Sequence, residues 1–377
     1  MRAAGDQPRD GACESCLRHG WLLGALSAAL DCRCRDRARL PELLALQDAE
    51  LVAAVGGRRR QELEILLRRF RAEDLEWAPA GYRICHHDPR YPAALSGSAA
   101  PRMLFLSADP TRLQELTAAP VAAIVGSRRA SDYGIETARG LSRGLAASGV
   151  TILAGLADGI AAATHSSAID AGGATIAVMA GGLEVSGPAR LGGLERSIRA
   201  SGCAVAELPD RISGRRWGRL AGERIVAELA ALTVVVEAED TPGDLHEAVL
   251  ARSRGRALAA VPGRISSPLT AGTHRLLREG ATLVRDAEDV LEVLCRVGTA
   301  RTTAGPRRAG TAAAGLDPHL REVLHRVGAG SDTPDRLIRD GIEEGDALLA
   351  LGRLELMGLL VRGAGGRYLP GGTGPPS

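Results

Sequence analysis

The 377-residue sequence contains no lysine, so all 47 of its basic side chains are arginine, and only 2% of its residues are aromatic. Its core must therefore consist of leucine, valine, isoleucine and alanine, for which an apolar content of 45% is ample. The formal net charge of +2 does not by itself indicate a nucleic-acid binder. Any basic surface must be local.

The sequence also lacks a secretory signal and a long apolar run. Residues 1–8 contain no apolar segment of the signal-peptide kind. The longest early apolar run, Trp21 to Leu30, is too short to cross a bilayer. An odd number of cysteines, 7, does not suggest a disulfide framework. We therefore expect a soluble, cytoplasmic protein of two or three domains.

Three short apolar segments between Val121 and Leu183 each run into glycine. Apolar, β-branched runs bounded by glycine are typical of buried parallel strands. Helical patterns over Tyr133 to Ser148 and Ile160 to Ala171 connect them. Repeated strand–glycine–helix units predict an α/β fold, a Rossmann-like, doubly wound and mostly parallel sheet.

The glycines at these strand ends favour a phosphate site. Ligands of such sheets bind outside the carboxyl ends of the strands, where glycine lets backbone N–H groups approach a phosphate and the next helix N-terminus favours its charge. Gly126-Ser127-Arg128 adds a hydroxyl and a guanidinium. The G-x-G-x-x-G fingerprint of dinucleotide binding is absent, and we predict no cofactor.

A cluster of arginines around Trp217 suggests a second contact region, which the pattern predicts to be a loop from Arg211 to Arg224. Arginines interleaved with an aromatic ring are typical of grooves for single-stranded nucleic acid, with charge for phosphates and a ring for base stacking. A solvated loop with a structural tryptophan explains the pattern equally well. The other arginines are Arg215, Arg216 and Arg219.

The N-terminal region contains two cysteine pairs, Cys13 with Cys16 and Cys32 with Cys34. Two pairs could supply a tetrahedral thiolate site for zinc, although reduced cysteines in a small helical module remain the alternative. The adjacent His86 and His87 do not form a metal pair if they lie on a strand, because neighbouring strand residues point to opposite faces.

Composition and pattern divide the chain into five parts. A helical domain covers residues 1–78 and an α/β core residues 79–297, with Leu194 to Ser201 and Ile225 to Ala231 among its helices. A segment rich in Thr, Ala, Gly, Arg and Pro, residues 298–315, has linker composition. Three helices and a β-hairpin over residues 316–370 suggest a winged-helix module, followed by a disordered tail, residues 371–377.

Several motifs in order resemble the DNA-processing protein A (DprA/Smf) family over nearly the whole chain. They are Ala123-Ile-Val-Gly-Ser-Arg128, Ala154-Gly-Leu-Ala-Asp-Gly-Ile-Ala-Ala-Ala-Thr-His165, Thr175-Ile-Ala-Val-Met-Ala-Gly-Gly-Leu183, Ala260-Val-Pro-Gly263 and Gly272-Thr-His-Arg-Leu-Leu-Arg-Glu-Gly-Ala281. The resemblance implies a protein that binds single-stranded DNA without strong sequence preference, protects incoming DNA in natural transformation and loads the RecA recombinase. It also implies a homodimer, and no enzyme activity.

The resemblance further implies the site residues. Arg128 would be the main phosphate anchor, and His165 would have either a structural or a ligand role. Together with the arginine and tryptophan cluster, this gives the predicted DNA contacts Gly126, Ser127, Arg128, Arg129, Gly155, Leu156, Gly159, Gly181, Gly182, Arg216, Trp217, Arg219 and Arg224.

The sequence departs from the family pattern where acidic residues replace others. The family's F-P-x-R-N-R-I segment corresponds here to Arg219-Leu-Ala-Gly-Glu-Arg224-Ile225. In this segment Gly222 replaces an arginine of the family pattern and Glu223 replaces its asparagine. Asp244 and Glu247 replace small hydroxylated residues. Added acid near a phosphate site predicts weaker DNA binding. A diverged paralogue acting through protein contacts is therefore an alternative function.

A second alternative is a nucleotide-pocket enzyme of the phosphoribohydrolase kind, which shares this sheet design. The P-G-G-x-G-T-x-x-E motif of those enzymes is absent, since Pro262-Gly263-Arg264 does not continue it. The sequence also suggests no paired carboxylates at a strand end for acid–base catalysis.

Overall fold

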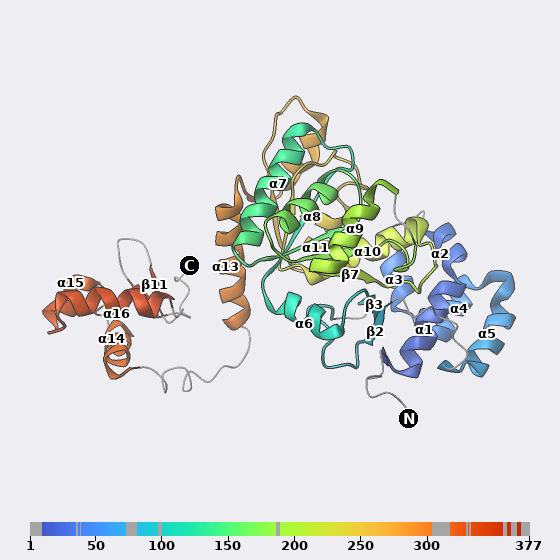
Figure 1. Cartoon of the computed structure of the whole chain (residues 1–377), viewed down its shortest axis with the longest axis horizontal. Coiled ribbons are helices and arrows are strands. Elements are labelled where there is room, and N and C mark those ends of the chain that lie inside the picture. Colours follow the sequence, from blue (N-terminus) through green and yellow to red (C-terminus); the bar gives the residue numbers. More distant parts are fainter. Residues whose placement is uncertain are drawn as a thin grey trace. The chain divides into compact units, whose positions relative to one another are not determined.

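A computed structural model of the chain describes residues 10–34, 37, 39–72, 81–96, 100–185, 189–303, 317–328, 331, 333–356, 360–362 and 368–370 (Figure 1). The chain divides into two compact units, Met1–Val297 and Gly298–Ser377. None of the helices within these ranges is long and apolar enough to span a membrane.

The first unit contains a ten-stranded sheet in the order β1-β2-β3-β7-β6-β5-β4-β8-β9-β10. Neighbouring strands are parallel except at β3, which runs antiparallel to both β2 and β7. The predicted mostly parallel, doubly wound α/β architecture is therefore confirmed. The strands are β1 (Asp10–Gly11), β2 (Tyr82–Cys85), β3 (Met103–Leu106), β4 (Val121–Val125), β5 (Thr151–Gly155), β6 (Thr175–Val178), β7 (Cys203–Ala206), β8 (Leu232–Val235), β9 (Ala257–Ala260) and β10 (Thr282–Leu283).

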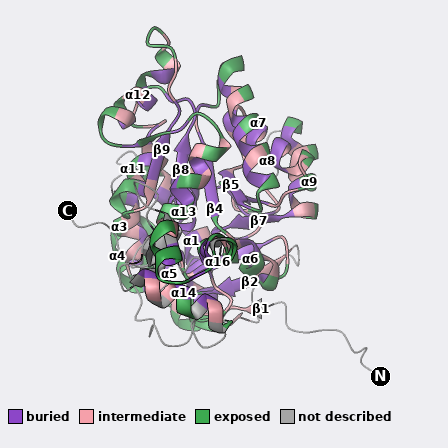
Figure 2. Ribbon diagram, turned by 90° about the vertical axis from the view of Figure 1, so that its left-hand side faces the viewer, coloured by how far each residue is buried: buried purple, intermediate pink, exposed green. Residues whose placement is uncertain are grey.

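Helices cover both faces of this sheet, so the central strands are buried between two layers (Figure 2). Alternate residues of β4 enter different cores: Ala123 packs with α6, α10, α11 and α12, whereas Ile124 packs with α7, α8 and α13. Because both faces of each central strand are buried, these strands are continuous apolar runs in the sequence. The helices are α6 (Pro110–Ala118), α7 (Asp132–Ala147), α8 (Ile160–Asp170), α9 (Gly192–Ser201), α10 (Arg215–Leu229), α11 (His246–Ser253), α12 (Ala271–Arg278) and α13 (Ala287–Thr303).

The N-terminal helices pack against α10 of the α/β core. Leu22, Leu30 and Leu51 of these helices form one apolar cluster with Trp217 and Leu220 of α10. The N-terminal region thus shares a core with the sheet unit. Its helices are α1 (Glu14–Ala25), α2 (Ser27–Arg33), α3 (Arg39–Ala45), α4 (Asp48–Val55) and α5 (Arg60–Arg69).

The second unit consists of three helices and a two-stranded antiparallel sheet around a core that includes Val323, Leu337 and Leu351. This is the set of elements that the sequence predicts, and their assignment as a winged helix remains a prediction. The elements are α14 (Pro318–Gly328), α15 (Pro334–Arg339), α16 (Glu344–Leu356), β11 (Leu360–Arg362) and β12 (Tyr368–Pro370).

Helix α13 continues to Thr303, into the segment whose composition suggests a linker. The rest of that segment, residues 304–315, and the predicted tail, residues 371–377, lie outside the described residues. The proposed domain boundary at residue 78 also falls in a stretch that the structure does not describe.

Candidate functional site

The predicted phosphate loop, residues 126–131, follows β4 and leads into α7. Its conformation is fixed by Glu237, the second residue after β8. The Glu237 carboxylate accepts hydrogen bonds from the Ser131 backbone N–H (2.9 Å) and hydroxyl (2.6 Å). The Ser127 N–H donates to the Glu237 carbonyl oxygen (2.7 Å). Glu237 is 1% exposed, so this carboxylate is part of the loop's internal structure.

The glycines of this edge are required by close packing between loops. A Cβ on Gly126 would lie 2.6 Å from the Glu237 carbonyl oxygen, and one on Gly159 would lie 2.3 Å from that of Ser127. Gly159 also has a φ of +72°, which disfavours other residues. These contacts join the loops after β4, β5 and β8 into one rigid surface.

The start of α7 already holds a negative charge, which corrects one sequence expectation. Ser131 caps the helix by accepting from the Gly134 N–H, and Glu237 lies so near that a Cβ on Gly134 would be 2.3 Å from its carboxylate. Asp132 adds a further acidic side chain in the first turn. The charge that favours this helix N-terminus is therefore supplied by the protein itself, and a phosphate is not needed there.

Arg128 and Arg129 project from this surface. Both side chains are exposed, and within the described residues neither guanidinium makes a hydrogen bond or an ion pair. Asp158, in the loop after β5, is bound by Arg190, and these hydrogen bonds together with attraction to Arg190 and Arg128 lower its pKa. Two guanidiniums on a rigid loop at the carboxyl edge of a parallel sheet can bind phosphate oxygens.

The acidic side chain of Glu247, on α11, interacts with Arg128 and with Glu223 of α10. Burial raises the pKa of Glu247 to about 8, repulsion from Glu223 adds to this shift, and Arg219 and Arg128 oppose it. Glu223 itself is bound by Arg219 (2.5 Å) and by His246 Nδ1 (2.6 Å). Glu223 and Glu247 thus form a pair of neighbouring carboxyl groups on two helices, which the sequence does not predict. Their proximity depends on helix packing, which the linear sequence does not report.

The predicted loop from Arg211 to Arg224 is mostly helix, because α10 begins at Arg215. Two glycines in this segment allow the helix to approach the sheet. A Cβ on Gly214 or Gly218 would lie 1.9 or 2.0 Å from the Ala180 carbonyl oxygen.

Two of the predicted DNA contacts on α10 are wrong. Trp217 is 0% exposed, packs among the N-terminal helices and donates from Nε1 to Ser27 Oγ (2.9 Å), so its ring cannot stack on a base. Arg224 is 2% exposed and pairs with the buried Glu207 at 2.5 Å, so it cannot reach a phosphate. Both residues hold the core together.

The remaining predicted residues of this group differ in accessibility. Arg216 is exposed, Arg219 is half-buried in its pair with Glu223, and Arg211 pairs with Glu184 at 2.8 Å. Gly181 and Gly182 are buried, and a Cβ on Gly182 would lie 2.0 Å from the Pro209 carbonyl oxygen. Gly155 and Leu156 are partly exposed at the end of β5, the strand that pairs with β4.

His165 has the structural role. It is fully buried, and its Nδ1 lies 2.7 Å from the Thr175 hydroxyl, which donates to the Ile152 carbonyl oxygen. Burial lowers its pKa to about 4, so the ring is neutral at pH 7.

The two cysteine pairs that could in principle supply a zinc site do not lie together. Cys34 packs inside the apolar cluster of the N-terminal helices, and Cys32 is exposed on α2. Cys13 and Cys16 lie beside Cys85 and His87 instead, and among the described residues these four form a group able to hold a metal ion. Sequence spacing could not reveal this, because about 70 residues separate the two halves.

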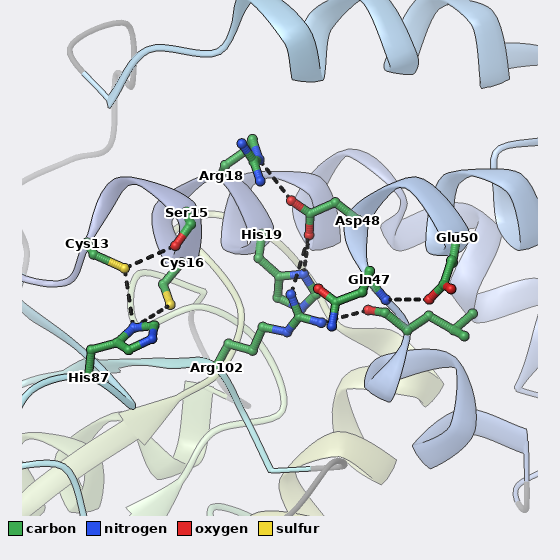
Figure 3. Close-up of polar contacts among 11 residues, drawn as sticks. Cys13, Ser15, Cys16, Arg18, His19, Gln47, Asp48, Glu50, His87 and Arg102 are labelled. Atoms are coloured by element: carbon green, nitrogen blue, oxygen red, sulfur yellow. Dashed lines mark hydrogen bonds and ion pairs between the residues drawn. The ribbon is translucent and has the colours of Figure 1, made fainter.

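A cavity of about 780 Å³ adjoins this group, and none of the predicted DNA contacts is among its described lining residues. Figure 3 shows Asp48 at this place, with its carboxylate bound by Arg18 and His19, each at 2.8 Å. The positive side chains here are thus partly neutralised within the fold.

The fold and this edge define a Rossmann-like protein with a rigid, arginine-bearing loop at the carboxyl ends of its parallel strands. Residues 82–295 match the model of the family described as "DNA recombination-mediator protein A". The chain belongs to this family.

Relatives and solved structures agree with this assignment. The chain is 34% identical over 331 residues to the putative DNA processing protein DprA of Mycobacterium tuberculosis, covering 82% of this chain and 81% of that protein. It is 38% identical over 173 residues to the protein Smf of Escherichia coli, covering 46% of each. The X-ray structure of DNA processing protein A from Streptococcus pneumoniae superposes with a TM-score of 0.60 and 27% identity, covering 74% of this chain and 98% of that one.

Proposed function

We propose that this DNA-processing protein binds single-stranded DNA through the loop after β4, with Arg128 and Arg129 as its phosphate contacts. The observation that carries this proposal is the exposure of both guanidiniums on a loop that Glu237 holds rigid. A preorganised loop loses little conformational entropy when it binds. Gly126, Ser127, Gly155, Leu156 and Gly159 form the backbone surface around these two arginines, and Arg216 supplies a further exposed charge.

We further propose that the chain acts by binding rather than by catalysis, as a homodimer in the cytoplasm, and that it passes the strand to the RecA recombinase during natural transformation. These details rest on the family resemblance. Asp158 favours weaker DNA binding than a site without it, since its charge reduces the positive potential around Arg128, and Glu247 adds to this effect once it loses its proton.

We expect Arg128→Ala to lower the affinity for oligo-dT by about 10- to 150-fold, because one charge-assisted contact contributes about 1.5–3 kcal/mol. The slope of log affinity against log salt should also flatten by about 0.7, the value for one lost phosphate contact on a single strand. Fluorescence anisotropy with labelled oligo-dT at several salt concentrations measures both quantities.

Arg143→Ala is the matched control, since Arg143 is an exposed arginine farther along α7. Equal losses of oligo-dT affinity in both variants would mean that Arg128 contributes only its positive charge and makes no specific contact with DNA. If the unaltered chain fails to bind oligo-dT even at low salt, the chain is a diverged paralogue and the DNA-binding proposal is wrong.

Affinity for oligo-dT should also fall as pH rises from 7 to 9. With a pKa of about 8, Glu247 is neutral below that pH and negative above it, where it competes with phosphate for Arg128. One added charge near the contact predicts a loss of about fivefold, equivalent to roughly 1 kcal/mol. Anisotropy titrations at constant ionic strength should show this dependence in the unaltered chain and a flat profile in Glu247→Gln.

The raised pKa of Glu247 also makes the stability of the folded chain depend on pH. The pKa of this carboxyl in the folded chain lies above its ordinary value of 4.5, so the folded state holds the proton more tightly and loses stability as pH rises from about 4.5 past 8. The advantage of Glu247→Gln in unfolding midpoint should therefore grow between pH 5 and pH 8.5. A constant difference would show that Glu247 has an ordinary pKa.

A further inference from the structure

Four potential metal ligands converge between the N-terminal segment and the edge of the sheet. The ligand atoms of Cys13, Cys16, Cys85 and His87 all lie within 4.8 Å of one another. Nδ1 of His87 lies 3.4 Å from the sulfur of Cys13 and 3.7 Å from the sulfurs of both Cys16 and Cys85. Figure 3 shows the Cys13 and Cys16 sulfurs directed toward the His87 ring.

These separations match the edges of a tetrahedral zinc site. With zinc–sulfur bonds of about 2.3 Å and zinc–nitrogen bonds of about 2.05 Å, a tetrahedron places nitrogen and sulfur about 3.6 Å apart. Cys16 and Cys85 are buried, whereas Cys13 and His87 are exposed, so an ion has a path from solvent to a partly enclosed position. Three thiols and an imidazole are a donor set typical of structural zinc.

The fold brings the two halves together through strand pairing. β1 pairs in parallel with β2, with Gly11 opposite Ile84, which places the segment leading to Cys13 beside Cys85. Cys13 is the residue that precedes α1, and its carbonyl oxygen accepts from the N–H groups of Cys16 and Leu17, each at 3.0 Å. The Cys-x-x-Cys pair therefore sits on a turn at the start of a helix, facing the sheet edge.

His87 reaches the cysteines from a turn that follows β2. The Asp88 N–H donates to the Cys85 carbonyl oxygen at 2.9 Å, and the Asp88 carboxylate binds Arg90 at 2.7 Å. Ser15, whose hydroxyl lies 3.2 Å from the Cys13 sulfur, can donate to a thiolate there. The turn and this hydroxyl orient the ligands.

We propose that Cys13, Cys16, Cys85 and His87 bind one Zn²⁺ ion, which fastens the N-terminal helices to the edge of the sheet. As the zinc–sulfur bonds form, the three thiols release their protons to solvent, and Nδ1 of a neutral His87 donates its lone pair. Four protein ligands fill a tetrahedral coordination sphere, so the site is structural and has no open position for a substrate.

The test uses the full-length chain, purified without chelator and without a histidine tag, with zinc measured by plasma mass spectrometry. We expect about one zinc ion per chain, as a closed four-ligand site requires. Cys85→Ser and His87→Ala should each lower zinc affinity at least tenfold, because even residues that only support a ligand contribute about 10- to 100-fold.

Two matched controls distinguish ligation from nearby effects. His86→Ala removes the neighbouring exposed imidazole, whose ring centroid lies 4.1 Å from that of His87, and Cys32→Ser removes an exposed thiol outside the group. Both variants should keep the zinc content of the unaltered chain. Equal zinc loss in His86→Ala and His87→Ala would overturn the ligand assignment.

A cobalt measurement on the unaltered chain keeps the test independent of how the variants fold. Replacing zinc by Co²⁺ should give the intense visible absorption of tetrahedral cobalt with thiolate ligands, together with a higher unfolding midpoint than that of the chelator-treated chain. A metal-free chain with three reactive thiols here, or one whose mass shows a Cys13–Cys16 disulfide, would contradict the proposal.

Discussion

Arg224→Met should lower the free energy of unfolding by about 3–5 kcal/mol, the usual cost of breaking a buried ion pair by removing one partner. Arg224 and Glu207 are 2% and 4% exposed and lie 2.5 Å apart. Without the guanidinium, the Glu207 carboxylate stays buried beside Glu228, which is 2% exposed. Urea unfolding of the full chain measures the effect.

Arg216→Met is the matched control for this variant. Arg216 is exposed on the same helix, so its replacement should change the free energy of unfolding by no more than about 0.5 kcal/mol. Adding Glu207→Gln to Arg224→Met should recover part of the lost stability, since the double variant removes the uncompensated charge. Reduced oligo-dT affinity with unchanged stability would instead assign Arg224 to DNA contact.

Trp217→Ala should be similarly destabilising, by about 3–5 kcal/mol, because it leaves a large cavity between α10 and the N-terminal helices. Trp217→Phe should cost less, since the ring packing is largely kept and the hydrogen bond to Ser27 is lost. Thermal and urea unfolding of both variants give these values.

The same phenylalanine variant separates a core role from base stacking. We expect Trp217→Phe to bind oligo-dT with unchanged affinity. If Trp217→Ala, at a temperature where it remains folded, lost the roughly 1–3 kcal/mol that a stacked base contributes, the burial of this ring would not describe the DNA-bound chain.

Local patterns predicted the part of the fold that depends on local sequence. Strands β4, β5 and β6 and helices α7 and α8 appear where glycine-bounded apolar runs and helical periodicity place them. The same pattern predicted that the loop of Gly126 to Arg129 would lie at a strand end, and it does. Whether that loop binds DNA remains a prediction.

Packing between distant segments decided the features that the sequence did not reveal. Gly214 and Gly218 lie in the segment predicted to be a loop, yet they allow helix α10 to approach the Ala180 carbonyl oxygen. The sequence pattern predicts that Trp217 and Arg224 line a DNA-binding groove. In the structure the N-terminal helices bury Trp217, and Arg224 is buried in its ion pair with Glu207. Spacing could not connect the first cysteine pair with the end of β2, because a strand pairing between β1 and β2 creates that contact.

The carboxylate of Glu237 at the start of α7 affects which anions can bind at the carboxyl edge of the sheet. A free phosphate or sulfate ion binds well where a helix N-terminus offers several unused N–H groups, and here Glu237 and Ser131 already meet that need. What remains is a pair of exposed side-chain charges, Arg128 and Arg129, each of which can bind one phosphate group. Such an arrangement discriminates by valency: a polymer that engages both arginines at once gains from their linkage, whereas a mononucleotide does not.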